Sequence, residues 1–167
     1  MKTARFLVVL LMALAFSAVA VAQTAEPVSN EEFGITVVPP GGWEVSTSDD
    51  KAVANFKHRG SQSQIQVIGT KLMNADVADV FFSTFHKTLT ESNFEKVSEE
   101  DSTVGGHEGK QIRYTFTHSG VTLEVMVFEF LAEDTAWLVI GYMQDSEREN
   151  HAGDFVSVIE NLQFHEG

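Results

Sequence analysis

Hydrophobic positions concentrate in three consecutive runs within residues 110–143, and short polar turn segments separate the runs. The first run, at 110–117, alternates apolar and polar residues, which is typical of a strand with one covered face. The second and third runs, at 125–131 and 137–142, are apolar on both sides of the strand except at Glu129. This pattern predicts an antiparallel meander whose two inner strands need a covering layer on each face.

Shorter segments rich in β-branched and aromatic residues precede the meander, and Pro, Gly and polar residues separate them. They predict further strands at 33–38, 43–45, 52–58, 64–70 and 94–104. A glycine-rich segment at 105–109 predicts the turn that leads from the last of these strands into the meander.

The hydrophobic period changes to that of a helix in two places. After Asn74, a residue suited to an N-cap, apolar side chains recur at helical spacing across 75–89. Ser146 and Glu149 have the spacing of a capping box and predict a second helix, whose apolar face extends to Leu162. The order of elements predicts an α+β fold: an antiparallel sheet of about seven strands with a helix on each face, a three-layer α/β/α sandwich.

The N-terminus has the pattern of an export signal. Lys2 and Arg5 precede an unbroken apolar run at 6–16, and small residues follow as far as Ala22. This pattern predicts a signal peptide at 1–22 with cleavage near Ala22, and a periplasmic or extracellular protein. The apolar run is short for a membrane span, so we expect no stable membrane anchor after cleavage.

The rest of the chain is predicted to form a flexible lead at 23–32 and a single α+β domain at 33–167, which we expect to be a monomer. Loss of the two basic residues of the signal peptide moves the net charge from −13 to −15. Such acidity argues against nucleic acid and anionic lipid surfaces as partners. The chain has no cysteine, so an exported domain must rely on packing rather than on disulfides.

Several anchors in this element order resemble those of the PsbP-like superfamily, which includes PsbP-type proteins and secreted bacterial proteins of the DcrB type. They are the spacing from Pro39 to Trp43, the Val-Gly-Gly turn at 104–106 and the closing segment 158–164. The resemblance covers about residues 33–164. It implies an antiparallel sheet with helices on both sides, and a binding or assembly role rather than an enzymatic one. We expect no cofactor. Fold analogy by itself is a weak guide to function.

Histidines offer the main alternative chemistry. His58, His107 and His118 lie at predicted strand ends or turns, and Glu108 follows one of them directly. Histidine and carboxylate side chains are suitable ligands for zinc or manganese. No two histidines have the spacing that places both on one helix face, so these four residues would form a metal site only if the fold brought them together.

Glu129 is the single acid within an apolar run. A carboxyl group at such a position has a raised pKa if it is buried without a partner. The more common outcome is that such a residue points to a sheet edge or pairs with a base across the hairpin, such as Arg113. The chain has no catalytic cysteine and no nucleophile-elbow motif, so a hydrolytic site would have to assemble from residues far apart in the sequence.

The sequence therefore favours a secreted, non-enzymatic binding or assembly module. It would bind a protein or a small ligand through one sheet edge or through the loops at 46–51 and 105–109. The alternatives are a periplasmic metal-binding factor that uses histidines and carboxylates, and a hydrolase with a site not visible in the sequence.

Overall fold

A seven-stranded antiparallel sheet forms the centre of the protein. The computed structural model describes residues 26–46 and 51–165. In spatial order the strands are β3 (Trp43–Val45), β4 (Ala54–His58), β5 (Gln64–Lys71), β9 (Thr135–Gln144), β8 (Val121–Ala132), β7 (His107–His118) and β6 (Glu95–Val104). The predicted meander is confirmed as β7, β8 and β9, and its last two strands lie in the middle of the sheet.

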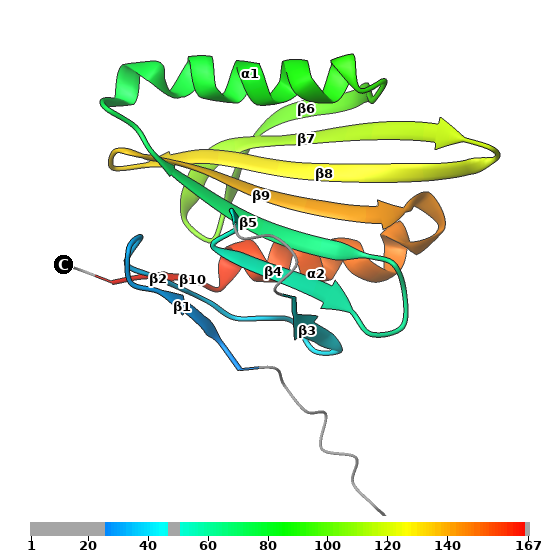
Figure 1. The fold of residues 1–167 in the computed structure, drawn as a ribbon, viewed down its shortest axis with the longest axis horizontal. Helices are drawn as coiled ribbons and strands as arrows, with labels where there is room; N and C mark the ends of the chain where they lie inside the picture. Colours follow the sequence, from blue (N-terminus) through cyan, green and yellow to red (C-terminus); the bar gives the residue numbers. More distant parts are fainter. Residues whose placement is uncertain (1–25, 47–50, 166–167) are drawn as a thin grey trace, which may run out of the picture.

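Two helices cover the sheet from opposite sides (Figure 1). On one side lies α1 (Ala78–Glu91), which follows a 3₁₀ turn at Ala75–Val77. On the other side lies α2 (Arg148–Glu160), which follows a 3₁₀ turn at Asp145–Glu147. The three-layer α+β architecture that the two-sided apolar runs predicted is therefore confirmed.

A second, three-stranded sheet was not expected. It consists of β1 (Val28–Asn30), β2 (Ile35–Val37) and β10 (Leu162–Phe164), with β2 in the middle. The strand predicted at 33–38 therefore pairs with the two ends of the domain and not with the main sheet. Its pairing with β1 also gives regular structure to part of the predicted lead at 23–32. The predicted signal peptide, residues 1–22, lies outside the described residues.

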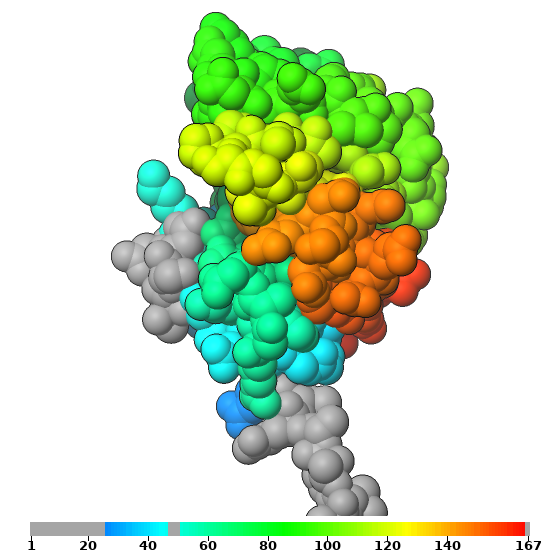
Figure 2. All heavy atoms as spheres, turned by 90° about the vertical axis from the view of Figure 1, so that its right-hand side faces the viewer, coloured from blue at the N-terminus to red at the C-terminus, as the bar shows by residue number. Residues whose placement is uncertain are grey.

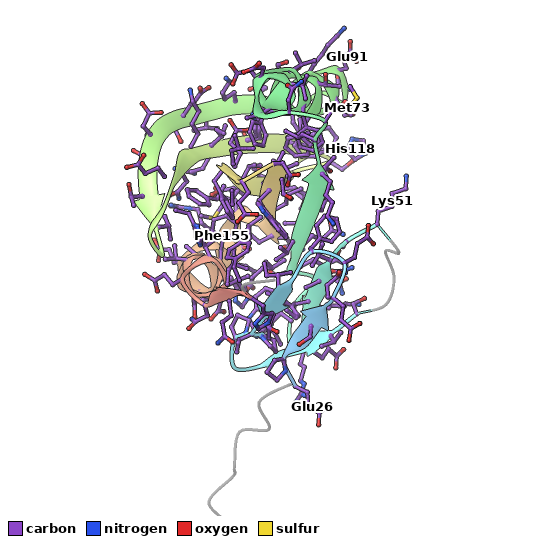
Figure 3. The ribbon with its side chains drawn as sticks, turned by 90° about the vertical axis from the view of Figure 1, so that its left-hand side faces the viewer. Glu26, Lys51, Met73, Glu91, His118 and Phe155 are labelled. Atoms are coloured by element: carbon purple, nitrogen blue, oxygen red, sulfur yellow. The ribbon has the colours of Figure 1, made fainter. Side chains whose placement is uncertain are left out.

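Each face of the main sheet has its own apolar core. Alternate residues of β8 and β9 enter different cores, so that both strands are buried on both faces. The core beneath α2 contains the two tryptophans and the residues Phe56, Ile65, Val67, Phe128, Phe130, Val139, Phe155 and Ile159. The core beneath α1 contains Leu89, Ile112, Tyr114, Val125, Val127, Leu138 and Ile140. Figure 3 shows Phe155 of α2 pointing into the layer between that helix and the sheet.

The element boundaries correct three details of the sequence prediction. The turn between β6 and β7 consists of Gly105 and Gly106, both with positive φ, so β7 already begins at His107. A Cβ at Gly105 would lie 2.9 Å from the backbone of α2, which leaves no room for a side chain. Neither Asn74 nor Ser146 caps a helix through its side chain, because each helix begins with a 3₁₀ turn. Leu162, expected on the face of α2, is the first residue of β10.

Truncation of Phe128 tests the buried core of β8. Because the Phe128 side chain is fully buried, Phe128→Ala should lower the free energy of unfolding by about 3–5 kcal/mol. Urea denaturation measures the change. His118→Ala, at the exposed end of β7, should stay within about 0.5 kcal/mol of the wild type. Equal losses in the two variants would contradict the described burial.

Candidate functional site

The structure does not gather the predicted metal ligands. His58 ends β4, whereas His107 and Glu108 begin β7 and His118 ends it. His107 and His118 are the two ends of one twelve-residue strand, which places them about 36 Å apart. Within residues 26–46 and 51–165, no group of three or more histidine or acidic side chains is arranged to hold a metal ion.

His107 has an apolar environment instead. Its ring lies 4.6 Å from the ring of Phe130 and 5.3 Å from that of Phe164, measured between centroids. Burial lowers the pKa of His107, because the charged imidazolium loses hydration there. The side chain therefore serves as packing between β7 and the second sheet.

Glu129 is buried, and its partner is a histidine rather than the predicted Arg113. Arg113 and Glu129 point to opposite faces of the sheet, because the residue opposite Glu129 on β7 is Lys110, three positions from Arg113. Arg113 instead forms two bonds to the fully buried Glu124, of 3.0 and 3.1 Å. The hairpin prediction identified the correct kind of pair but the wrong acid.

His86 of α1 joins the helix to the sheet through both of its ring nitrogens. Its Nε2 lies 2.7 Å from Glu129 Oε2, and its Nδ1 lies 2.8 Å from the hydroxyl oxygen of Tyr114. A carboxylate only accepts hydrogen bonds, so Nε2–H donates to Glu129 and the Tyr114 hydroxyl donates to Nδ1. Burial, followed by the charges of Glu99 and Glu129, raises the pKa of Tyr114 to about 12.

A second polar network joins α2 to the opposite side of the sheet. Asp154 Oδ2 accepts from Trp43 Nε1 at 2.9 Å and lies 3.2 Å from Nδ1 of the buried His151. His151 Nε2 lies 3.3 Å from Ser61 Oγ and 3.4 Å from a Glu147 oxygen. Figure 2 shows the β4–β5 turn, which carries Ser61, beside the beginning of α2.

Ser61, His151 and Asp154 have the order of a nucleophile, a base and an orienting acid. The surroundings of Ser61 favour a structural interpretation. Its Oγ also accepts from Ser63 N–H at 3.2 Å and lies 3.1 Å from His58 Nδ1. Glu147 competes with it for the same nitrogen of His151. These contacts make the network a connection between α2 and β4 rather than an exposed nucleophile.

The sequence indicates one part of this second network through the spacing of three residues. Glu147, His151 and Asp154 are spaced four and three residues apart, which places them on one face of a helix. The partners Ser61 and Trp43 lie about 90 and 111 residues away in the sequence, so only the fold identifies them.

An apolar groove lies between α1 and the β5–β9 part of the sheet, with a volume of about 520 Å³. Its walls are Ile68, Leu72, Val77, Val80, Phe81, Phe85 and Leu138, together with three threonines. Thr84 and Thr88 of α1 donate their hydroxyls to backbone carbonyls one turn earlier in the helix, at 2.7 and 3.0 Å. The groove therefore offers a ligand much apolar surface and few free hydrogen-bonding groups.

Comparison with known proteins identifies the fold and nothing finer. No family profile matches the chain, and no curated protein matches it. The solved structure of cyanobacterial PsbP from Synechocystis sp. PCC 6803 superimposes with a TM-score of 0.63 at 12% identity, over 89% of this chain and 96% of the other.

Two further structures agree with this result. LpqN of Mycobacterium tuberculosis, described as involved in cell envelope biogenesis, gives a TM-score of 0.61 at 15% identity, over 84% of this chain and 90% of that one. The Ran-binding protein Mog1p of Saccharomyces cerevisiae gives 0.53 at 14% identity, over 81% and 88%. The chain therefore has the PsbP-like fold, as the element order implied.

The high pKa of Tyr114 predicts a loss of stability in alkali. Its pKa is about 12 in the folded protein against 10.0 for free tyrosine, so the unfolded chain ionises first as the pH rises. Between about pH 10 and 12 the free energy of unfolding should therefore fall, and Tyr114→Phe should remove this part of the fall. Urea denaturation across that pH range, for both proteins, measures the difference. Identical pH profiles would contradict the described burial of the phenol.

Removal of Asp154 tests the network at α2. Asp154→Ala leaves Trp43 Nε1 and His151 Nδ1 without their acceptor, so the free energy of unfolding should fall by about 1–3 kcal/mol. Asp101→Ala, at an exposed acid on β6, should change it by less than about 0.5 kcal/mol. Thermal or urea denaturation compares the two variants, and equal effects would show that the Asp154 acceptor contributes nothing.

Proposed function

We propose that the protein is a secreted, non-enzymatic binding module that holds an extended apolar chain, such as an acyl chain, in the groove between α1 and β5. The groove carries this proposal, because a volume of about 520 Å³ is within the usual range of small-molecule sites. Apolar residues form most of its lining.

The hydrogen bonding of the groove selects an acyl chain over a peptide. The main chain of an extended peptide would lose its bonds to water there, and Thr84 and Thr88 already donate to the backbone of their own helix. An alkyl chain has no such bonds to lose and gains roughly 0.8 kcal/mol for each buried CH₂ group.

Apolar side chains around the groove are more exposed than a purely structural helix requires. Val80 is 64% exposed and Met73, just before the helix, is 93% exposed. Figure 3 shows Met73 at the surface next to α1. An apolar surface of this kind is typical of a place where a ligand or partner is bound.

The signal-peptide pattern at 1–22 supports export, and the proposal therefore assigns this binding activity to the periplasm or the outside of the cell. No helix of the described residues is long and apolar enough to cross a membrane. LpqN, with the same fold, is described as involved in cell envelope biogenesis, which is consistent with an acyl-chain ligand for this chain. The metal-binding alternative lacks converging ligands among the described residues, and we do not propose it.

Binding of a fluorescent acyl chain tests the proposal. Protein purified after export is titrated into BODIPY-labelled dodecanoate, and unlabelled fatty acids compete; saturable binding that strengthens with chain length is the expected result. Val80→Asp places a charge beside the apolar wall and should weaken binding about tenfold or more. Val121→Asp, at an exposed valine of β8 outside the groove, should bind as the wild type does.

Absence of saturable binding, or equal binding by the two variants, would refute the groove as the site. Both variants should retain the thermal stability of the wild type, since both valines are exposed.

A further inference from the structure

The sheet ends on one side in β6, a long strand whose side chains are exposed over most of its length. Among the described residues, β6 pairs with β7 alone, and every residue from Glu95 to Asp101 is exposed. It begins beneath the C-terminal end of α1 and ends beside α2 (Figure 1). Ten residues extend about 33 Å, whereas β3 at the opposite end of the sheet has only three residues.

An edge strand of this length is a template for another strand. Along its open side, alternate backbone N–H and C=O groups have no ladder partner in 26–46 or 51–165, and an added strand can bond to them. A bulge at Val97 interrupts the register with β7, after which the pairing runs without a break from Ser98 to Val104. This regular part could accept a segment of about seven residues.

The charges on β6 decide what can be added. The strand carries four acids, Glu95, Glu99, Glu100 and Asp101, and one base, Lys96. Glu99 forms ion pairs with Lys96 and with Lys110 of β7, with distances of 2.5 and 3.2 Å from its carboxylate oxygens to the two Nζ atoms. Within the described part of the chain, no ion pair joins Glu95 or Glu100 to a base.

This acidity excludes a second copy of the same strand. An antiparallel pair of β6 strands would set the acids at 99–101 against one another, and like charges directly opposite in a sheet are destabilising. Acidic residues on an edge thus prevent self-association and at the same time favour an extended segment rich in Lys or Arg.

A polar hollow at the end of β6 provides a place for a basic side chain. It lies across β6 and β7, has a volume of about 480 Å³, and is lined by Asp101 and Glu108 together with Lys110. The side chain of Asp101 is 91% exposed, and only a long contact of 4.0 Å joins its carboxylate to Lys110, so a partner can reach it. The hollow lies beside the same regular stretch of strand that would receive the backbone.

From these observations we propose that β6 binds an extended, basic segment of a partner protein by adding it to the sheet as an eighth strand, centred on Ser98–Val104. Hydrogen bonds from the backbone of β6 supply the part of the affinity that does not depend on the sequence of the bound segment. Glu100, Asp101 and Glu108 supply the preference for Lys or Arg. This site is separate from the apolar groove and does not depend on the function proposed for it.

The test uses the exported protein and a fluorescein-labelled peptide of nine alternating lysines and threonines, with fluorescence anisotropy at about 0.15 M salt. Saturable binding is expected, and the same peptide with glutamate for lysine should not bind. Two further peptides carry N-methyl groups on every second residue. One is methylated at the odd-numbered positions and the other at the even-numbered positions, so that each blocks the N–H groups along one edge of the peptide. Methylation along the bonded edge should weaken binding about tenfold or more, and methylation along the other edge should have little effect.

Charge reversal tests the location. The double variant Glu100→Lys/Asp101→Lys should lose the lysine peptide and bind the glutamate peptide. The control Asp76→Lys/Asp79→Lys makes the same change in net charge at the start of α1, and should keep the original preference. Binding that both methylated peptides retain, or that both double variants lose equally, would reduce the effect to general charge attraction and overturn the proposal, as would absence of binding.

Discussion

Burial of β8 and β9 on both faces is the constraint on which the structure depends. Residues 125–128 and 136–140 are buried without interruption, so neither face of these strands can meet water. An antiparallel sheet usually leaves one face solvated, and two covering layers are needed where it does not. α1 and α2 provide those layers, and the position of every other element follows from them.

Each helix is fixed to the sheet by a histidine with a partner at both ring nitrogens. His86 connects α1 to Tyr114 and Glu129 of the sheet, and His151 of α2 contacts Ser61 of the β4–β5 turn and Asp154 of its own helix. Apolar packing alone permits a helix to shift along a sheet, whereas paired hydrogen bonds hold one position. The polar residues that first suggest chemistry in this chain therefore act mainly in defining how the layers fit together.

The surfaces proposed for binding lie where the two helical layers stop. α1 is narrower than the sheet beneath it, which leaves the apolar groove along β5 on one side. On the other side β6 extends beyond both helices, with its backbone edge open and its side chains acidic. The groove has few free hydrogen-bonding groups, which suits an acyl chain. The open edge of β6 consists of such groups, which suits a basic extended segment.

The sequence by itself determined the layers, because the hydrophobic period is a local property. Apolar runs with two buried faces at 125–131 and 137–142 require a covering layer on each side. Apolar residues at helical spacing before and after the meander predict the two helices that form these layers. It failed where the partner is distant. Glu129 was recognised as unusual, but the choice of His86 over Arg113 depends on which face each strand residue points to. The pairing of β1 and β10 with β2 and the separation of His107 from His118 were decided by the tertiary structure alone. So were the apolar groove and the choice of β6, since the sequence indicated a sheet edge without specifying which one. Long-range register and the lateral extent of a helix over a sheet are not encoded in any local pattern.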